Sequence, residues 1–239
     1  MEYQVNINGL PVTAAFSEEN IREIFVPLLE KLYQLQKEKG GRILVLMAAP
    51  PGCGKSTLAS FLGKLSEGRI TVIGMDGFHR YQKYLTTNFI QRDGQRIPMV
   101  KIKGAPITFD LDKLTTKVRQ VASGQECLWP IYDRLYHDPI EDAIPVSGDI
   151  VLLEGNYLLL NQPGWKKLVK YADYTISLTA EESLLEKRLV ERHIVSGKTP
   201  EEAKAFVAGS DMANAREVMN HSLTPDLCLK VTEDGFEVI

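Results

Sequence analysis

The sequence predicts an α/β fold, in which a doubly wound, mostly parallel sheet carries helices on both faces. From residue 42 onward, apolar stretches of strand length alternate with amphipathic helical stretches, which is the pattern of a parallel sheet. The composition, 44% hydrophobic and 25% charged, is that of a chain able to bury a core of this size.

The first 40 residues have a different pattern. Val5 to Phe16 alternates around Asn8-Gly9, which predicts a β-hairpin. Apolar residues at three- and four-residue spacing then predict a helix, with a kink or a restart at Pro27. The expected domains are residues 1–40, an appended hairpin and helix, and residues 41–239, the main domain.

The main domain contains elements of both types. Strands are predicted where several apolar residues are consecutive, and helices where they recur every three or four positions. Residues 85–107, rich in Gly, Pro and charge, are predicted to form a long functional loop. Thr179 and Glu182 predict a capping box. In chain order the predicted elements are strand 43–47, helix 56–65, strand 70–74, helix 109–123, strands 150–154 and 174–178, helices 180–195 and 200–221, and strands 227–229 and 236–238.

The net charge and the cysteine pattern argue against a nucleic-acid-binding protein and against a cysteine metal site or a set of disulfide bridges. The formal net charge is −3, whereas a nucleic-acid binder usually shows a basic face. Cys53, Cys127 and Cys228 fit neither a metal spacing nor an even set of bridges, as expected for free thiols in a reducing cytosol. We find no secretory signal pattern and no apolar run near the ~20 residues of a membrane span. We therefore expect a soluble cytoplasmic protein without nucleic-acid or membrane partners, with a homodimer as the default oligomer.

A glycine-rich loop follows the strand 43–47. Residues 49–57 read Ala-Pro-Pro-Gly-Cys-Gly-Lys-Ser-Thr, the Walker A pattern with Ala at its first position. Its glycines let backbone N–H groups turn toward phosphate oxygens, and the following helix adds the positive end of its dipole. A chance glycine-rich turn is the alternative, but the flanking strand and helix supply the context that the motif requires. The sequence therefore predicts a P-loop NTPase that binds ATP through Pro51, Gly52, Cys53, Gly54, Lys55, Ser56 and Thr57.

Three residues of this loop have expected roles of their own. Lys55 reaches the β- and γ-phosphates, and the Ser56 hydroxyl ligates Mg²⁺. Cys53 stands near a helix N-terminus, where a thiol can be acidified for redox control. We favour the simpler interpretation of a small packed loop residue, because cysteine usually packs as a small hydrophobe.

Carboxylates stand at the ends of two further strands. Asp76 follows the strand 70–74, and Glu154 ends the strand 150–154. In an open α/β sheet, ligands bind beyond the carboxyl ends of the strands. Phosphoryl transfer needs one carboxylate at the acceptor hydroxyl and another for the metal. We assign Asp76 as the general base and Glu154, with Ser56, as the Mg²⁺ ligands; a turn-capping Asp and a surface Glu are the alternatives.

Two arginines lie one turn apart in the helix 180–195. By helical angle Arg188 and Arg192 fall between Leu184 and Leu185, on the apolar side. Guanidinium groups there suit a helical lid, about residues 180–221, that closes over the transferring phosphate and excludes water. We assign both as catalytic with Lys55; structural salt bridges with nearby glutamates are the alternative.

The acceptor is expected to meet polar and aromatic side chains of the connecting segments. Residues 130–139 are dense in such groups and form either a pocket wall or an ordinary polar loop. No His or Cys spacing suits a transition metal. The expected substrate contacts are Asp76, His79, Lys103, Tyr132, Arg134, His137 and Asn156.

Over about residues 42–220 the motifs resemble the uridine kinase, pantothenate kinase and phosphoribulokinase group of P-loop kinases. In that group the Asp of the Asp-x-Phe segment is the base near the acceptor hydroxyl, which maps onto Asp76, and the lid arginines map onto Arg188 and Arg192. His193 stands where uridine kinases usually continue Arg-Asp. Residues 154–157 and 210–216 resemble bacterial kinases linked to sugar (fructose) uptake. The segments that carry the resemblance are 49–57, 75–79, 103–106, 108–110, 130–133 and 153–156.

These features predict a kinase that transfers the γ-phosphoryl of MgATP to a hydroxyl of a small metabolite, such as a sugar, a nucleoside or a pantothenate-like compound. A nucleoside monophosphate kinase is the alternative, which Arg92, Arg96 and Arg134 leave open. A regulatory or energy-coupling NTPase is the third possibility. It is disfavoured because the sequence contains no Asn/Thr-Lys-x-Asp guanine-reading segment and no Leu-Ser-Gly-Gly-Gln segment.

Overall fold

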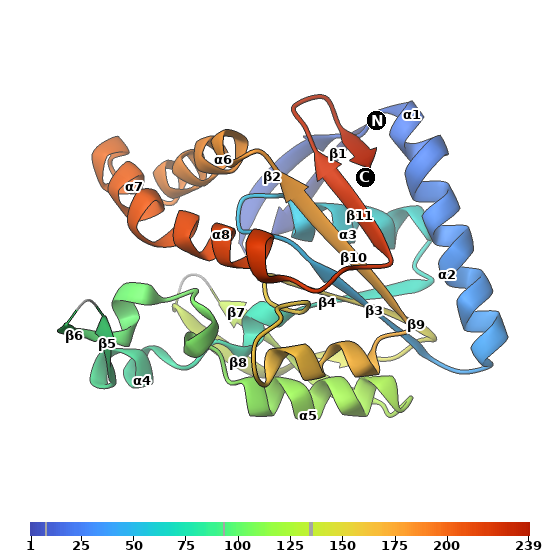
Figure 1. The fold of residues 1–239 in the computed structure, drawn as a ribbon. Helices are drawn as coiled ribbons and strands as arrows, with labels where there is room; N and C mark the ends of the chain where they lie inside the picture. Colours follow the sequence, from blue (N-terminus) through green and yellow to red (C-terminus); the bar gives the residue numbers. More distant parts are fainter. Residues whose placement is uncertain (8, 93, 134–135) are drawn as a thin grey trace.

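A computed structural model describes residues 1–7, 9–92, 94–133 and 136–239. At the centre of this described part lies a six-stranded sheet with the order β12-β11-β10-β3-β9-β4 (Figure 1). All neighbouring strands are parallel except β12, which runs antiparallel to β11. The predicted mostly parallel sheet is therefore confirmed. Its strands are β3 (Ile43–Ala48), β4 (Ile70–Gly74), β9 (Ile150–Gly155), β10 (Tyr174–Ala180), β11 (Leu227–Val231) and β12 (Phe236–Val238).

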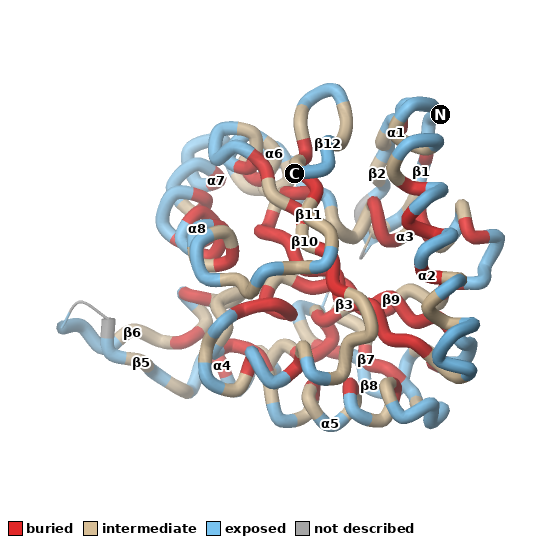
Figure 2. Tube along the Cα trace, turned by 45° about the vertical axis from the view of Figure 1, so that its right-hand side comes forward, coloured by how far each residue is buried: buried red, intermediate tan, exposed pale blue. Residues whose placement is uncertain are grey.

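Helices cover both faces of the sheet, and the central strand β3 shows why. Every side chain of β3 is buried, so the strand has no polar face and packs on both sides (Figure 2). Ile43, Val45 and Met47 pack with α2 (Val26–Lys39) and α3 (Lys55–Leu65). The intervening residues of β3 face the other layer, which contains α5 (Leu111–Ala122) and the 3₁₀ turns Trp165–Lys167 and Val169–Tyr171.

The N-terminal segment forms the predicted hairpin, β1 (Glu2–Ile7) and β2 (Leu10–Ala15). Residues 18–39 form one continuous helical run made of α1 (Glu18–Asn20), a π-helical turn (Ile21–Phe25) and α2. Pro27 lies in the first turn of α2, directly after the change from π- to α-helix, and the predicted kink or restart corresponds to this irregularity and not to a break. Several side chains of this segment are buried in the same cluster as the sheet, and the domain boundary at residue 41 stays a prediction.

The predicted loop over residues 85–107 was wrong. This stretch contains α4 (Gln82–Thr87), the antiparallel pair β5 (Phe89–Arg92) and β6 (Gln95–Pro98), and the 3₁₀ turns Met99–Ile102 and Pro106–Thr108. Each element is six residues or shorter, which is too short to produce a readable hydrophobic period.

Of the two interpretations of residues 130–139, the ordinary polar loop was wrong. Residues 130–133 end β7 (Cys127–Asp133) and residues 138–139 begin β8 (Asp138–Val146), the two strands of an antiparallel hairpin, while residues 134–135 lie outside the described part of the chain. A register shift between Trp129 and Ile131 breaks the alternation that marks a strand in sequence. Trp129 Nε1 donates a 2.8 Å hydrogen bond to the carbonyl oxygen of Gly74, which fixes the hairpin to the end of β4.

Three helices, α6 (Glu182–Val195), α7 (Pro200–Phe206) and α8 (Met212–His221), form the predicted helical layer at one side of the sheet (Figure 1). A π-helical segment (Val207–Asp211) joins α7 to α8. The predicted capping box at Thr179 was wrong, because Thr179 lies within β10 and the N-cap of α6 is Glu181. A capping box does occur in this layer, at Thr199 and Glu202.

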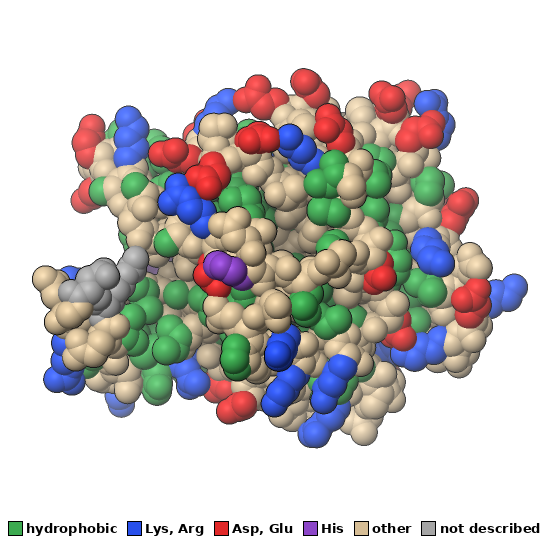
Figure 3. Space-filling view, in the orientation of Figure 1, with side chains coloured by type: hydrophobic (Ala, Val, Ile, Leu, Met, Phe, Trp, Pro, Cys, Tyr) green, Lys and Arg blue, Asp and Glu red, His purple; other side chains and the backbone are tan. Residues whose placement is uncertain are grey.

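None of the described helices combines the length and apolar character that crossing a membrane would require. On the face drawn in Figure 3, acidic and basic side chains are interspersed.

Candidate functional site

The glycine-rich loop connects β3 to α3. Gly52 and Gly54 have φ angles of +83° and +87°, a conformation that side chains with a Cβ rarely adopt. Gly54 is the N-cap of α3, and its carbonyl accepts the first helical hydrogen bond, from Leu58 N. The N-terminal N–H groups of α3 are therefore available to an anion, as expected for a phosphate loop.

The first side chains of α3 meet the end of β9. Ser56 Oγ donates a 2.9 Å hydrogen bond to Glu154 Oε1, and Lys55 Nζ lies 3.9 Å from Glu154 Oε2. Glu154 is only 8% exposed, so the Lys55 ammonium compensates a buried carboxylate. Ser56 and Glu154 were expected together as Mg²⁺ ligands and Lys55 at the phosphates, and the fold brings the three side chains next to one another.

The donor set at this point suits Mg²⁺. Among the described residues, no three His, Cys, Asp or Glu side chains gather into a metal cluster. Magnesium does not need one, because it commonly takes one or two protein oxygens and completes its shell with water and phosphate. One hydroxyl and one carboxylate, 2.9 Å apart beside a phosphate loop, fit that requirement.

Asp76 lies in a 3₁₀ turn (Met75–Phe78) directly after β4. Gly77 makes this position possible, because a Cβ there would overlap the carbonyl of Pro130 and lie 2.9 Å from Ile131 N. The turn is closed from the other side by His79, whose Nδ1 donates to the Asp76 carbonyl oxygen at 2.9 Å. Asp76 is thus held between the end of the sheet and β7.

One cavity of about 270 Å³ contains the groups that phosphoryl transfer requires. It brings together Asp76, Ser56, Glu154 and Tyr132, which come from four different elements. Its other lining residues are Asn6, Ile7, Ser60, Val72, Ile73, Gly74, Gly77, Pro130, Ile131 and Ile144. The cavity therefore lies at the carboxyl ends of β4 and β9, where the strand-end argument predicted the site.

Lys103 and His137 are near this cavity but do not line it. Lys103 Nζ donates to Gln82 Oε1 at 2.8 Å and to the His137 carbonyl at 2.7 Å, and lies 5.1 Å from the ring centre of Tyr132. Burial lowers the pKa of Lys103. His137 is exposed at the turn of the β7–β8 hairpin, and its contact with Lys103 is through the backbone. The predicted substrate residue Arg134 lies outside the described residues.

His79 and Asn156 occupy positions beside the strand ends. The His79 ring lies between the rings of Phe109 and Tyr132, with centres 4.0 and 5.0 Å away. Asn156 follows β9, and its Oδ1 is buried without a hydrogen-bond partner in the described part of the chain. Neither His79 nor Asn156 is among the lining residues of the cavity, so their predicted contact with the substrate stays a prediction.

The helix α6 lies against the phosphate loop. A Cβ on Gly52 would be 2.9 Å from Leu189 Cγ and 3.1 Å from the Leu185 carbonyl. Arg188 and Arg192 are half-buried, in agreement with their predicted placement on the apolar side. The salt-bridge alternative named Glu181, Glu191 and their neighbours. Glu181 pairs with Lys230 at 2.7 Å, and Arg192 does form an ion pair, with Asp211.

The sequence analysis missed a buried acid in this layer. Asp211, only 8% exposed, accepts a 2.7 Å hydrogen bond from His193 Nε2, and its Oδ2 lies 3.7 Å from Arg192 Nη2. Asp211 lies in the π-helical segment, where side chains do not follow the α-helical spacing, so its burial could not be predicted from the sequence pattern. The segment 210–216 was noted only as part of the family resemblance.

Cys53 is a packed residue of the loop. Burial raises the pKa of its thiol to about 12, and the nearby charges of Lys55 and Arg188 only partly oppose this effect. The structure therefore favours the simpler interpretation of Cys53 over an acidified thiol.

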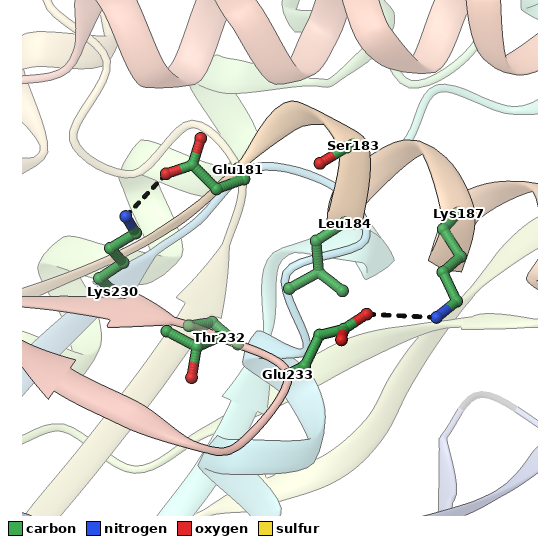
Figure 4. A pocket seen from close by; sticks show the side chains of 8 residues that line it. Glu181, Ser183, Leu184, Lys187, Lys230, Thr232 and Glu233 are labelled. Atoms are coloured by element: carbon green, nitrogen blue, oxygen red, sulfur yellow. Dashed lines mark hydrogen bonds and ion pairs between the residues drawn. The ribbon is translucent and has the colours of Figure 1, made fainter.

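A second cavity, of about 320 Å³, lies between the start of α6 and the end of β11 (Figure 4). It is bounded by the first turns of α6 and by the carboxyl end of β11. Two ion pairs flank it, Lys230–Glu181 at 2.7 Å and Lys187–Glu233 at 3.3 Å. The sequence analysis did not find this cavity, although the strand-end rule applies to β10 and β11 as well. Its lining residues are Glu181, Ser183, Leu184, Lys187, Lys230, Val231, Thr232 and Glu233.

Comparison with known proteins gives consistent matches. The model of the Phosphoribulokinase / Uridine kinase family matches residues 44–218. Protein YggC of Escherichia coli K12 is 38% identical, with 98% of each chain covered. "Putative uridine kinase C227.14" of Schizosaccharomyces pombe is 36% identical, with 79% of this chain and 83% of the yeast protein covered. The crystal structure of a "putative fructose transport system kinase" from Silicibacter sp. TM1040 is 31% identical, with a TM-score of 0.77 and coverage of 85% of this chain and 98% of that chain.

Proposed function

The chain belongs to the phosphoribulokinase / uridine kinase family, and we propose that it transfers the γ-phosphoryl group of ATP to a hydroxyl of a small, uncharged metabolite. The observation that carries this proposal is the single cavity lined by Asp76, Ser56 and Glu154 at the end of the phosphate loop. An acceptor base and two metal-type oxygens in one cavity are what hydroxyl phosphorylation requires.

ATP fits across the carboxyl edge of the sheet. Its phosphates bind the N–H groups of residues 52–57, with Lys55 at the β- and γ-phosphates. The acceptor cavity lies on the β4 and β9 side, so the nucleoside extends to the opposite side, into the cavity between α6 and the end of β11. Leu184 offers an apolar surface there for a base.

Ser56 and Glu154 are the residues that would hold Mg²⁺, which supplies charge neutralisation on the phosphates when bound. Asp76 orients the acceptor hydroxyl and accepts its proton as the oxygen attacks the γ-phosphorus. Arg188 and Arg192, from the helix that packs on the loop, donate to the transferring group and to the departing ADP oxygen. Closure of this helical lid excludes water from the reaction.

The lining of the acceptor cavity favours an uncharged acceptor. Its described lining residues include no Lys or Arg, so a second phosphate would lack a counter-charge there. Arg96 was one of the arginines that could have bound the phosphate of a nucleoside monophosphate. It lies instead over the ring of Phe89 in the β5–β6 hairpin, 4.3 Å from the ring centre, and does not line the cavity. A sugar or a nucleoside fits better than a monophosphate or a carboxylate-bearing compound. The relatives named for uridine and fructose suggest both classes for testing.

The test is ADP release from the purified protein with MgATP and a panel of sugars, nucleosides, pantothenate and nucleoside monophosphates. One uncharged hydroxyl compound is expected to raise turnover well above the blank. A response to monophosphates alone would make the protein a monophosphate kinase instead. Slow hydrolysis of ATP that no acceptor changes would reject the kinase proposal. Cytoplasmic location and a homodimer stay predictions from the sequence.

The base is tested by Asp76→Asn, which keeps the shape of the side chain and removes its proton-accepting charge. We expect kcat to fall by about 10²-fold or more, with ATP affinity nearly unchanged. Lys55→Ala is the matched comparison, in which ATP binding and turnover both weaken. Wild-type kcat in Asp76→Asn would show that another group deprotonates the acceptor.

A further inference from the structure

The N-terminal hairpin lies outside residues 44–218, the part of the chain that the family model matches. Its strand β1 nevertheless contributes two residues, Asn6 and Ile7, to the cavity that contains Asp76 and Glu154. We propose that the hairpin is a wall of the transfer site, and that Ile7 makes the enzyme select the acceptor hydroxyl over water. This inference rests on the proposed function.

The hairpin is fixed to the helix that carries the phosphate loop. Tyr3 Oη and Ser60 Oγ share a 2.8 Å hydrogen bond, and Ser60 lies one helical turn after Ser56 in α3. Phe16, at the end of β2, stacks on Phe61 of the same helix with ring centres 3.9 Å apart. The wall therefore keeps a defined position relative to the Ser56 hydroxyl, which the proposal requires.

Chemically, Ile7 offers only an apolar surface. The neighbouring Asn6 is polar, and its Oδ1 accepts a 2.7 Å hydrogen bond from Gly9 N in the turn. Ile7, Val72 and Ile144 belong to the apolar part of the cavity lining, and Ser56, Asp76 and Glu154 belong to its polar part. A wall of this kind fills space near the γ-phosphate without offering a hydrogen bond that would retain water.

Loss of the wall would admit the competing reaction. A water molecule near Asp76 would attack the γ-phosphorus while Asp76 accepts its proton. The bond between the γ-phosphorus and the bridging oxygen would break, and ADP and inorganic phosphate would leave. The ratio of ADP formed to acceptor phosphorylated measures this hydrolysis of ATP by water.

The experiment measures this ratio for Ile7→Ala with MgATP and the acceptor found in the panel. We expect the ratio to rise several-fold above that of the wild type, while ATP affinity and the melting temperature stay close to wild type. Ile7→Leu restores the apolar volume and should bring the ratio back toward the wild-type value. Tyr3→Phe, which removes the anchor to Ser60, should raise the ratio in the same direction by less.

Val12→Ala is the matched control, because Val12 lies on the partner strand opposite Val5 and does not line the cavity. An unchanged ratio in folded Ile7→Ala would overturn the inference, and so would an equal rise in Val12→Ala, which would indicate general loosening. If the wild-type protein phosphorylates no acceptor, the proposed function fails. If the wild-type protein phosphorylates an acceptor but Ile7→Ala leaves the ratio unchanged, only the proposed role of the hairpin is rejected, and the proposed function stands.

Discussion

At the scale of single residues, burial decides the chemistry of the site. The carboxylate of Glu154 is tolerated inside the molecule because Lys55 and Ser56 lie beside it. The thiol of Cys53 is buried too, and burial outweighs the charges of Lys55 and Arg188, so the pKa of Cys53 rises to about 12. The carboxylate at the end of β9 thus has a close cationic partner and a hydrogen-bond donor, whereas burial keeps the thiol of the phosphate loop protonated.

The raised pKa of Cys53 predicts a dependence of stability on pH. Above pH 9 the thiol of the unfolded chain loses its proton while the native thiol keeps it, so the unfolded state binds fewer protons. Stability should therefore fall as pH rises from about 9 to about 12, by up to ~1.4 kcal/mol per pH unit from this group. The midpoints of urea unfolding at pH 8 and pH 10 measure this loss of stability. Cys53→Ala should show a smaller decrease than the wild type; an equal decrease would assign the effect to other groups.

The close contact of Gly77 with the backbone of β7 leads to a second prediction for a single residue. In Gly77→Ala the added Cβ meets backbone atoms of Pro130 and Ile131, which cannot rotate away, so the turn that holds Asp76 must move. We expect destabilisation by roughly 1–3 kcal/mol and a large fall in kcat, with ATP affinity retained. Urea unfolding and steady-state kinetics measure the two effects. Gly41→Ala, where a Cβ would meet nothing within 4 Å, is the control and should change neither.

Most residues of the polar side of the site were predictable from the sequence. Lys55, Ser56, Asp76 and Glu154 stand at strand ends or in a loop with fixed spacing, and parallel strands bring their ends to one edge. Asp211 was not predictable, because its partner His193 is 18 residues away and only the folded lid brings the two together. Ile7 was missed for the same reason, since the hairpin reaches the cavity by packing on α3.

At the scale of elements, a buried carboxylate connects two parts of the lid, the π-helical segment and α6. Asp211 lies in a π-helical segment, a distortion frequently found at functional sites, and contacts both Arg192 and His193 of α6. We therefore expect Asp211 to act as a positioning residue, which holds Arg192 in place without touching the reacting atoms.

Asp211→Asn removes the charge that faces Arg192. We expect kcat to fall by roughly tenfold or more, equivalent to the ~1.5–3 kcal/mol of a hydrogen bond to a charged group, with the KM for ATP little changed. Steady-state kinetics separates the two constants. The control is Glu182→Gln, which breaks the exposed pair with Arg216 and should leave kcat unchanged. A rise in KM without a change in kcat would contradict a positioning role.

The elements that the sequence failed to predict share a physical cause. The β5–β6 and β7–β8 hairpins lie outside the central sheet, and their strands are short or interrupted by a register shift. These hairpins are stabilised by contacts with other parts of the chain, such as the hydrogen bond between Trp129 and Gly74. The central strands were predictable because burial on both faces makes them continuously apolar.

At the scale of the whole molecule, one hydrophobic cluster joins the N-terminal segment to the sheet. Phe25 is fully buried and contacts the rings of Phe16, Phe61 and Phe236, with centres 5.3–5.9 Å apart. These residues come from the N-terminal segment, from α3 and from the last strand of the sheet. We therefore expect the protein to unfold in a single cooperative transition.

Phe25→Ala tests this cooperativity. Removing a fully buried ring from a shared core should lower the free energy of unfolding of the whole protein by about 3–5 kcal/mol. Urea unfolding followed by circular dichroism should show one transition with a lower midpoint. Val26→Ala, next in sequence but 38% exposed, should shift the midpoint far less. A second transition at low urea, with the main one unchanged, would show that residues 1–40 unfold separately.

The contact between Asn20 and Phe236 has a consequence for synthesis on the ribosome. The Asn20 side chain donates to the Phe236 carbonyl at 2.9 Å and accepts from Phe236 N at 3.0 Å, across 216 residues. At about 5–20 residues per second, translation leaves Asn20 without this partner for on the order of ten seconds or more. During that time the aromatic rings around Phe25 lack the cover of Phe236. The segment around Asn20 thus leaves the ribosome long before Phe236 and finishes folding late, and until then the nascent chain exposes an apolar surface that a chaperone can bind.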